Sequence, residues 1–345
     1  MKFVYDLSLV FDAAREALFG LAAKAGLPWE VPTLVTKVVT ASILFGFVNL
    51  SAIFLVWWER KISAHMQSRL GPMRVGWHGI LQTIADGMKL LQKEDIVPAE
   101  ADKIAHFCAP LVVIVGAVLA YVVIPFGPRL WAADLNVGVL YVFAVTGLGV
   151  IGILMAGWGS NNKYSLLGGL RAAAQLLSYE IPMVVSVLGV VLIAGTLSLT
   201  KVVEAQSRAW FIFYQPVGFF IFFLCSLAEA NRAPFDLAEA ESELTGGFHT
   251  EYSGLKFSMF FLAEYPAMFT GAAMGTTLFL GGWRGPFLPP WMWFLIKCYG
   301  LIFVMMWFRW TFPRFRIDQL MAFCWKFLLP LSFVNLLVTG LVVLL

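Results

Sequence analysis

The chain has 345 residues, of which 60% are hydrophobic and 13% are charged, and its mean hydropathy is +0.81. A composition this apolar excludes an ordinary soluble domain and predicts a polytopic membrane protein. The net charge of +3 is too small to indicate binding of nucleic acid. The four cysteines stand apart without a CxxC pair, so we expect no metal ion or iron–sulfur cluster to be held by this chain alone.

Residues 1 to 34 form a segment that differs from the rest of the chain. Apolar side chains recur there at helical spacing between Phe3 and Leu21, while Asp6, Asp12 and Arg15 interrupt them. This pattern predicts an amphipathic helix on the membrane surface and not a signal peptide. Residues 35 to 345 are predicted to form a single membrane domain.

The membrane domain contains eight apolar stretches, each matching the roughly 20 residues that cross a bilayer. They lie near residues 35 to 57, 104 to 126, 137 to 157, 176 to 198, 211 to 229, 257 to 280, 289 to 308 and 323 to 344. The long loops on one side carry about twice as many lysines and arginines as the opposite side. The sequence therefore predicts an all-α integral membrane protein with interfacial amphipathic helices, long cytoplasmic loops and both termini on the opposite side of the membrane.

The first long loop, residues 58 to 103, includes another predicted interfacial helix. Its apolar face is formed by Ile80, Ile84, Met88 and Leu91, and its polar face by Gln82, Asp86, Lys89 and Lys93. Together with the end of the first span, this helix is placed to frame a lateral opening for a molecule dissolved in the lipid. Charged residues such as Arg60 and Arg69 also fit simple snorkelling at the membrane edge.

The second long loop leads into a helix rich in glycine and alanine around Arg171. Small residues allow a neighbouring backbone to approach closely, and no strand precedes them to make a phosphate loop. Glu180 lies beyond them, two residues before Pro182, which loosens the helix. Two interpretations of Glu180 remain open, a stopping point for protons and a structural ion pair with Arg171.

The third long loop concentrates negative charge in a chain that otherwise avoids it. Seven of the 21 acidic residues fall between residues 229 and 264, namely Glu229, Asp236, Glu239, Glu241, Glu243, Glu251 and Glu264. The first and last lie inside apolar sequence, where ionisable groups are costly and usually functional. Clustered, partly desolvated acids have coupled pKa values, as a proton path requires. A solvated acidic loop is the alternative, and residues 236 to 244 place acids on one face only if they are helical.

These loops resemble one known family. The segments on which the resemblance rests are ERK at 59 to 61, QSRLGPMRVG at 67 to 76, ADGMKLLQKE at 85 to 94, GWGSNNKYSLLGGLRAAAQLLSYE at 157 to 180, AEANRAPFDLAEAESELTGGFHTEYSGLKFSMFFLAEY at 228 to 265 and PRFRIDQLMAFCWKFLLP at 313 to 330. They are similar to the H-type membrane subunit of the proton-pumping NADH:quinone oxidoreductase, the mitochondrial NADH dehydrogenase subunit 1 family of respiratory complex I. The resemblance covers residues 35 to 345.

The resemblance implies a subunit that forms the membrane side of a quinone cavity and couples quinone reduction to proton pumping. It implies that part of the fold resembles half of an antiporter-like channel. It also implies partners: hydrophilic-arm subunits carrying FMN and iron–sulfur clusters, small membrane subunits and antiporter-like subunits. Quinone would be a substrate bound at a shared interface, with no redox centre in this chain and no covalent catalysis.

The resemblance also assigns roles to residues. The quinone cavity and its opening are expected at Arg60, Arg69, Asp86, Lys89, Arg232 and Phe235. The route for protons and coupling is expected at Glu180, Glu229, Asp236, Glu239, Glu241, Glu243, Glu251 and Glu264. Alternatives are the equivalent subunit of a membrane-bound hydrogenase-type complex, a structural anchor for a peripheral enzyme and a free-standing cation/proton antiporter. An antiporter usually has acids or lysines near the middle of several helices, whereas these acids are predicted near the cytoplasmic ends.

Overall fold

The computed structural model describes residues 7–24, 28–237 and 245–345, and this part of the chain is helical without a β-strand. The first half contains α2 (Ser8–Lys24), α3 (Glu30–Met66), η1 (Trp77–Gly79), α4 (Gln82–Gln92), α5 (Lys103–Leu119), η2 (Ala120–Val123), α6 (Gly138–Thr146), α7 (Leu148–Gly159) and α8 (Lys163–Ala194). The second half contains α9 (Leu199–Ala205), α10 (Phe211–Tyr214), α11 (Pro216–Glu229), η3 (Gly247–His249), α13 (Gly254–Phe279), α14 (Pro290–Thr311), α15 (Ile317–Phe323), the π-helical η4 (Cys324–Leu328) and α16 (Leu329–Leu344).

Six helical stretches of the described chain are long and apolar enough to cross a membrane. They are Glu30–Met66, Lys103–Val123, Gly138–Gly159, Lys163–Ala194, Pro290–Thr311 and Ile317–Leu344. The other two predicted spans are also helical, but α11 has only 14 residues and α13 is less apolar. The all-α membrane fold is therefore confirmed, while the number of eight crossings stays a prediction.

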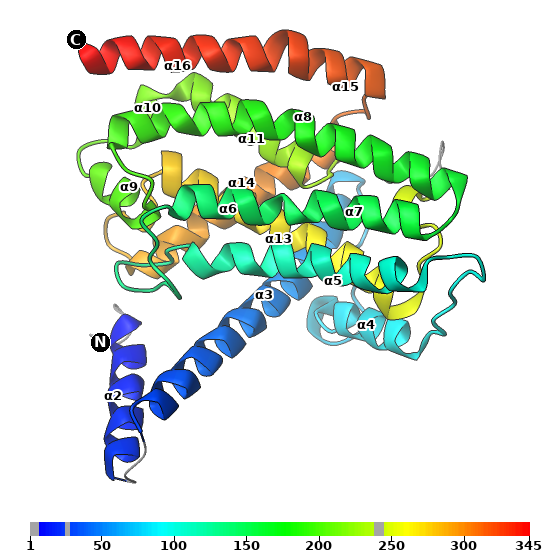
Figure 1. Cartoon of the computed structure of the whole chain (residues 1–345), viewed down its shortest axis with the longest axis horizontal. Helices are drawn as coiled ribbons and strands as arrows, with labels where there is room; N and C mark the ends of the chain where they lie inside the picture. The colour runs from blue at the N-terminus through cyan, green and yellow to red at the C-terminus, as the bar shows by residue number, and fades with distance from the viewer. Residues whose placement is uncertain (1–6, 25–27, 238–244) are drawn as a thin grey trace.

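The long helices form a layered bundle. Helices α16, α8, α7 and α5 lie side by side in that order, and α13 packs against α5, α11 and α14 (Figure 1). Helix α3 crosses the bundle obliquely, and its first half projects from it together with α2 (Figure 1). Leu34, Val38 and Phe45 on the projecting half are exposed, as expected for side chains that face lipid.

Two helices extend further toward the long loops than hydropathy predicts. Helix α3 continues to Met66, past the predicted end at residue 57, and α8 starts at Lys163 instead of residue 176. The Asn162 side chain caps α8 by accepting a hydrogen bond from the Tyr164 amide at 2.9 Å. Because polar residues extend these helices, an apolar window ends too early. Glu59 and Glu180 consequently lie inside long helices.

Candidate functional site

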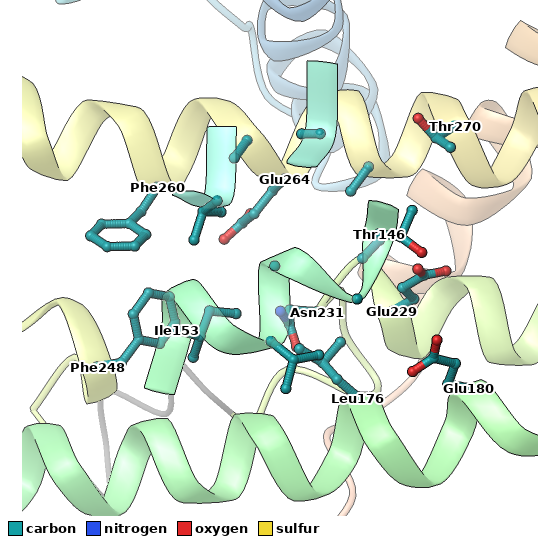
Figure 2. A pocket seen from close by; sticks show the side chains of 18 of the residues that line it. Thr146, Ile153, Leu176, Glu180, Glu229, Asn231, Phe248, Phe260, Glu264 and Thr270 are labelled. Carbon is teal, nitrogen blue, oxygen red and sulfur yellow. The ribbon is translucent and has the colours of Figure 1, made fainter. Parts of the chain in front are cut away.

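The centre of the bundle encloses a cavity of about 90 Å³ that three of the predicted acids line. Glu180 reaches it from α8, Glu229 from the end of α11 and Glu264 from α13 (Figure 2). Because one water needs about 10 to 15 Å³ of such volume, the cavity has room for several waters. Thr146, Asn231 and Thr270 also line it, and apolar side chains make up most of the wall. The structure therefore brings together three carboxylates that are separated by up to 84 positions in the sequence.

Glu180 occupies the middle of α8 beside a break in that helix's hydrogen bonding. Pro182 has no amide hydrogen to donate to the Ser178 carbonyl, and the thiol of Cys324 donates to that carbonyl instead at 3.0 Å. Arg171 lies nine residues before Glu180, which on an α-helix is half a turn away and about 13 Å along the axis. Helix geometry thus excludes the ion pair between these two residues. Glu264 likewise lies near the middle of α13, whereas Glu229 is the last residue of α11.

The position of Glu229 is fixed by the chain that follows α11. The Gln175 side chain donates to the Ala228 carbonyl at 2.9 Å and to the Phe235 carbonyl at 2.7 Å, which ties this turn to α8. The Glu229 carboxylate lies between the Thr146 hydroxyl and Glu180 (Figure 2). Thr146 is available there because α6 ends at this residue and α7 begins after Gly147.

The side of the cavity nearest the long loops is closed by Phe248 and Phe260. Phe248 is held by a close approach between α8 and η3, because a Cβ on Gly168 would lie only 2.6 Å from the Gly247 Cα. The Ser165 hydroxyl also donates to the Phe248 carbonyl at 2.9 Å. The predicted role of the glycines in close packing is therefore confirmed.

A chain of buried ion pairs of alternating sign leads from the cavity to α3 and α14. Arg232 lies 3.2 Å from Glu264 and 3.2 Å from Glu59, and Glu59 also binds Arg309. These four side chains come from the turn after α11, from α13, α3 and α14, so the chain joins four separate elements. The side chains of Arg232 and Glu59 are only 2% and 7% exposed, so water screens their interaction weakly.

Arg232 remains charged in spite of its burial. Its guanidinium lies over the Tyr265 ring, 4.3 Å from the centroid. Burial disfavours the charged form, but Glu59, Tyr265 and Glu264 outweigh it and raise the pKa of Arg232 above its usual value. The residue is thus a fixed positive charge between two carboxylates.

Two of the residues predicted at the quinone opening, Arg60 and Asp86, are joined by contacts between α3 and α4. Arg60 lies 2.5 Å from Asp86, and Gln82 donates to the same carboxylate at 3.1 Å. Partial burial opposes ionisation of Asp86, but the hydrogen bonds from Arg60 and Gln82 prevail and lower its pKa. Arg69 contacts Gln67 at 2.6 Å in the exposed loop after α3, and Lys89 is exposed on α4. The helix predicted around Asp86 is confirmed.

The remaining predicted residues lie away from the cavity. Asp236 pairs with Arg314 at 2.9 Å, and the Phe235 ring packs between Tyr179 and Phe315. Glu251 accepts a hydrogen bond from Asn162 at 2.5 Å and lines a separate surface pocket. Glu239, Glu241 and Glu243 are outside the described residues.

Sequence reasoning did not assign Glu59, Arg309, Thr146 or Asn231 to the site. Glu59 directly follows an apolar run of more than twenty residues. A carboxylate at the end of a predicted span is the sequence feature that could have assigned Glu59 to the site. Arg309 similarly lies in the last turn of α14, near the end of an apolar run. Nothing in the local sequence marks Thr146 or Asn231, because only the packing of α7 and α11 against α8 brings these neighbouring residues to the acids.

Fold and site together define a multi-pass, all-α membrane protein with a buried acidic cavity and an internal chain of ion pairs. Among the described residues, no group of three or more His, Cys, Asp or Glu side chains is arranged to hold a metal ion. The chemistry that the arrangement supports is the holding and passing of protons within the membrane.

Comparison with known proteins identifies the family. A family model described as NADH dehydrogenase matches residues 39–340. The NADH-quinone oxidoreductase H-type subunit 1 of Geobacter sulfurreducens is 52% identical over 331 residues, which are 90% of this chain and 95% of that protein. The H-type subunit of Dehalococcoides mccartyi is 54% identical over 298 residues, with 86% and 84% covered. The H-type subunit of Carboxydothermus hydrogenoformans is 51% identical over 301 residues, with 86% of each covered.

The chain therefore belongs to the family of the H-type subunit of NADH-quinone oxidoreductase, the membrane subunit of complex I. The resemblance seen in the loop sequences is confirmed over most of the chain. The relatives give no support to a hydrogenase-type complex or to a free-standing antiporter.

Proposed function

We propose that this chain forms the membrane side of a quinone-binding cavity and couples quinone reduction to proton translocation. The observation that carries the proposal is the continuous connection from Arg309 through Glu59 and Arg232 to Glu264, which lines the acid cavity. A change of charge near α3 and α14 thereby alters the electrostatic potential at the Glu264 carboxylate in the centre of the bundle. Burial makes that transmission strong, because the local dielectric constant is low.

In this proposal quinone reaches the cavity sideways, past the ends of α3 and α4. The Arg60–Asp86 pair holds these two helices together, and Arg69 and Lys89 border the same region. Arg232 and Phe235 face the quinone side, and Asp236 and Glu251 extend the acidic surface toward the loops. Reduction of quinone creates a demand for protons, which shifts the protonation of Glu264, Glu229 and Glu180 in turn.

The proposal also includes the partner subunits, the membrane and the orientation of the chain. Its partners are hydrophilic-arm subunits with FMN and iron–sulfur clusters, which supply electrons to quinone, and small and antiporter-like membrane subunits, which receive the coupling signal. The membrane is the bacterial inner membrane, with both termini on the periplasmic side. Residues 1 to 34 act as an N-terminal surface extension to the single membrane domain of residues 35 to 345.

The test uses inner membranes that contain the whole complex. Glu229→Gln and Glu264→Gln remove a titratable group from the cavity but keep its shape, so quinone-linked NADH oxidation and proton uptake into inverted vesicles should fall about tenfold or more. Ferricyanide-linked NADH oxidation, which bypasses quinone, should persist and show that the complex is assembled. Glu204→Gln, at an exposed acid on α9, is the matched control. Unchanged quinone-linked turnover and proton uptake in both cavity variants would contradict the proposal.

A further inference from the structure

A second pocket opens on the face of the protein that carries the long loops. It has a volume of about 840 Å³ and is lined by residues from the chain before α5, the turn between α7 and α8, and Glu251. Its polar lining residues include Glu100, Ser160, Asn162 and Lys163. Glu251 is half-buried in its wall and is oriented by the hydrogen bond from Asn162. Solvent can therefore bring protons to this carboxylate.

A stacked pair of titratable rings lies next to Glu251. The imidazole of His106 and the phenol ring of Tyr252 are parallel to within 4°, with their centroids 4.0 Å apart. His106 is 1% exposed and Tyr252 is 6% exposed. Neither imidazole nitrogen nor the Tyr252 hydroxyl makes a well-formed hydrogen bond within the described residues, although the Glu251 backbone and the Ser160 hydroxyl are close enough to interact with them.

Other polar and charged groups surround the stacked rings of His106 and Tyr252. Pro110 has no amide hydrogen, so the His106 carbonyl lacks its usual partner one turn along α5. The charged groups that act on His106 are Lys256, Asp95 and Glu251, and the first two form an ion pair at 2.7 Å. Of the two acids that act on His106, Glu251 is therefore the one outside the Lys256–Asp95 ion pair.

The ring stack continues to the wall of the acid cavity. Tyr252 meets Phe260 edge to face at 4.9 Å between centroids, and Phe260 meets Phe248 in the same way at 5.3 Å. Phe248 and Phe260 both line the cavity that contains Glu264. His106 and Tyr252 therefore occupy the layer between an open surface pocket and the buried acids.

Packing alone does not account for a histidine at this position. A phenylalanine would stack on Tyr252 equally well, whereas a buried polar group without a well-formed hydrogen bond lowers the stability of the folded protein. A polar group kept at such a cost is often one that works with water or protons. Imidazole can accept a proton on one ring nitrogen while it releases another from the second.

We propose that Glu251, His106 and Tyr252 form a proton inlet from the surface pocket to the acid cavity, separate from the quinone opening. A proton from pocket water passes to Glu251 and then to one nitrogen of His106, and the other nitrogen releases a proton through water at the Tyr252 hydroxyl to Glu264. Phe248 and Phe260 act as an apolar gate that must move aside to admit this water. The inlet rests on the proposed function, because it supplies the acids which that function discharges.

The test is the variant His106→Phe in membranes that contain the whole complex. It preserves the stack on Tyr252 but removes both nitrogens. Quinone-linked NADH oxidation and proton uptake should fall about tenfold, which is less than the effect of a group in the chemical step because water can still leak along the route. The loss should be largest at alkaline pH, where protons are scarce, so the alkaline limb of the pH–rate profile moves to lower pH. Glu251→Gln, an isosteric change in the pocket wall, should move it in the same direction.

Two further measurements separate this inlet from packing and from the proposed function. If His106→Gln, which loses the aromatic stack, is inactive while His106→Phe has normal turnover and a normal pH profile, the histidine serves packing and the inlet is overturned. The inlet is also overturned if Glu251→Gln leaves the pH profile unchanged. Glu229→Gln should still lower quinone-linked turnover and proton uptake about tenfold or more in either case, so the proposed function is judged independently.

Discussion

The buried position of Arg232 leads to a prediction about stability. Arg232→Met fills the space of the side-chain stem but removes the positive charge that lies 3.2 Å from both Glu59 and Glu264. Removing one partner of a buried ion pair typically costs about 3 to 5 kcal/mol, because the other charge is left in a medium of low dielectric constant. Glu59 keeps Arg309, and Glu264 loses the cation that lies 3.2 Å away, so replacing Glu264 tests where the penalty falls.

A double variant isolates that penalty. In Arg232→Met with Glu264→Gln, no carboxylate is left facing the methionine from α13, so about 1 to 3 kcal/mol of the loss should be recovered. The measurement is the thermal inactivation temperature of the complex in mild detergent, supported by ferricyanide-linked activity as a check on assembly. The control is Arg316→Met, whose side chain is 79% exposed and lies 3.8 Å from Asp318. If Arg232→Met were no more destabilising than this surface change, the ion-pair chain would be hydrated and the reasoning wrong.

Two further predictions concern the loops that surround the site. Gly168→Ala places a methyl group against the Gly247 backbone, so it should destabilise the protein by about 1 to 3 kcal/mol and expose residues 245 to 253 to proteolysis. The control is Gly46→Ala, which has open space around it and should have neither effect. The docking of α4 on α3 should depend on pH: because the pKa of Asp86 is lowered in the folded protein, the Arg60–Asp86 pair contributes fully at neutral pH and is lost as the pH falls below about 4. Hydrogen–deuterium exchange of residues 82 to 92 should therefore accelerate on acidification beyond the intrinsic pH effect, and Asp86→Asn should abolish this dependence.

Hydropathy and helical spacing predicted the elements better than their ends. The apolar runs identified where α3, α5, α8 and α14 lie, because burial in lipid requires about twenty apolar residues in each. They could not predict that α8 begins at Lys163, since its first turns are stabilised by the Asn162 cap and by glycine contacts with another loop. Propensity and tertiary packing, not hydropathy, set those boundaries.

The candidate site was predicted as a set of acids but not as a geometry. Glu180, Glu229 and Glu264 were selected because carboxylates are costly inside apolar sequence, and the cavity contains all three. The pairing of Arg232 with Glu59 joins residues 173 positions apart, and no local spacing rule reaches that far. For the same reason Asp236 and Glu251 could not be separated from the cavity acids before the fold was known.

The ion-pair chain of Arg309, Glu59, Arg232 and Glu264 contains two positive and two negative side chains, so it carries no net charge. One added proton on either carboxylate leaves a whole uncompensated positive charge inside the membrane, where it is poorly solvated. An anion beside α3 and α14 would neutralise that charge, so binding of the anion and uptake of the proton must each strengthen the other by the same factor. A reaction that makes quinone transiently negative would in this way draw a proton into the bundle before any large movement of the helices.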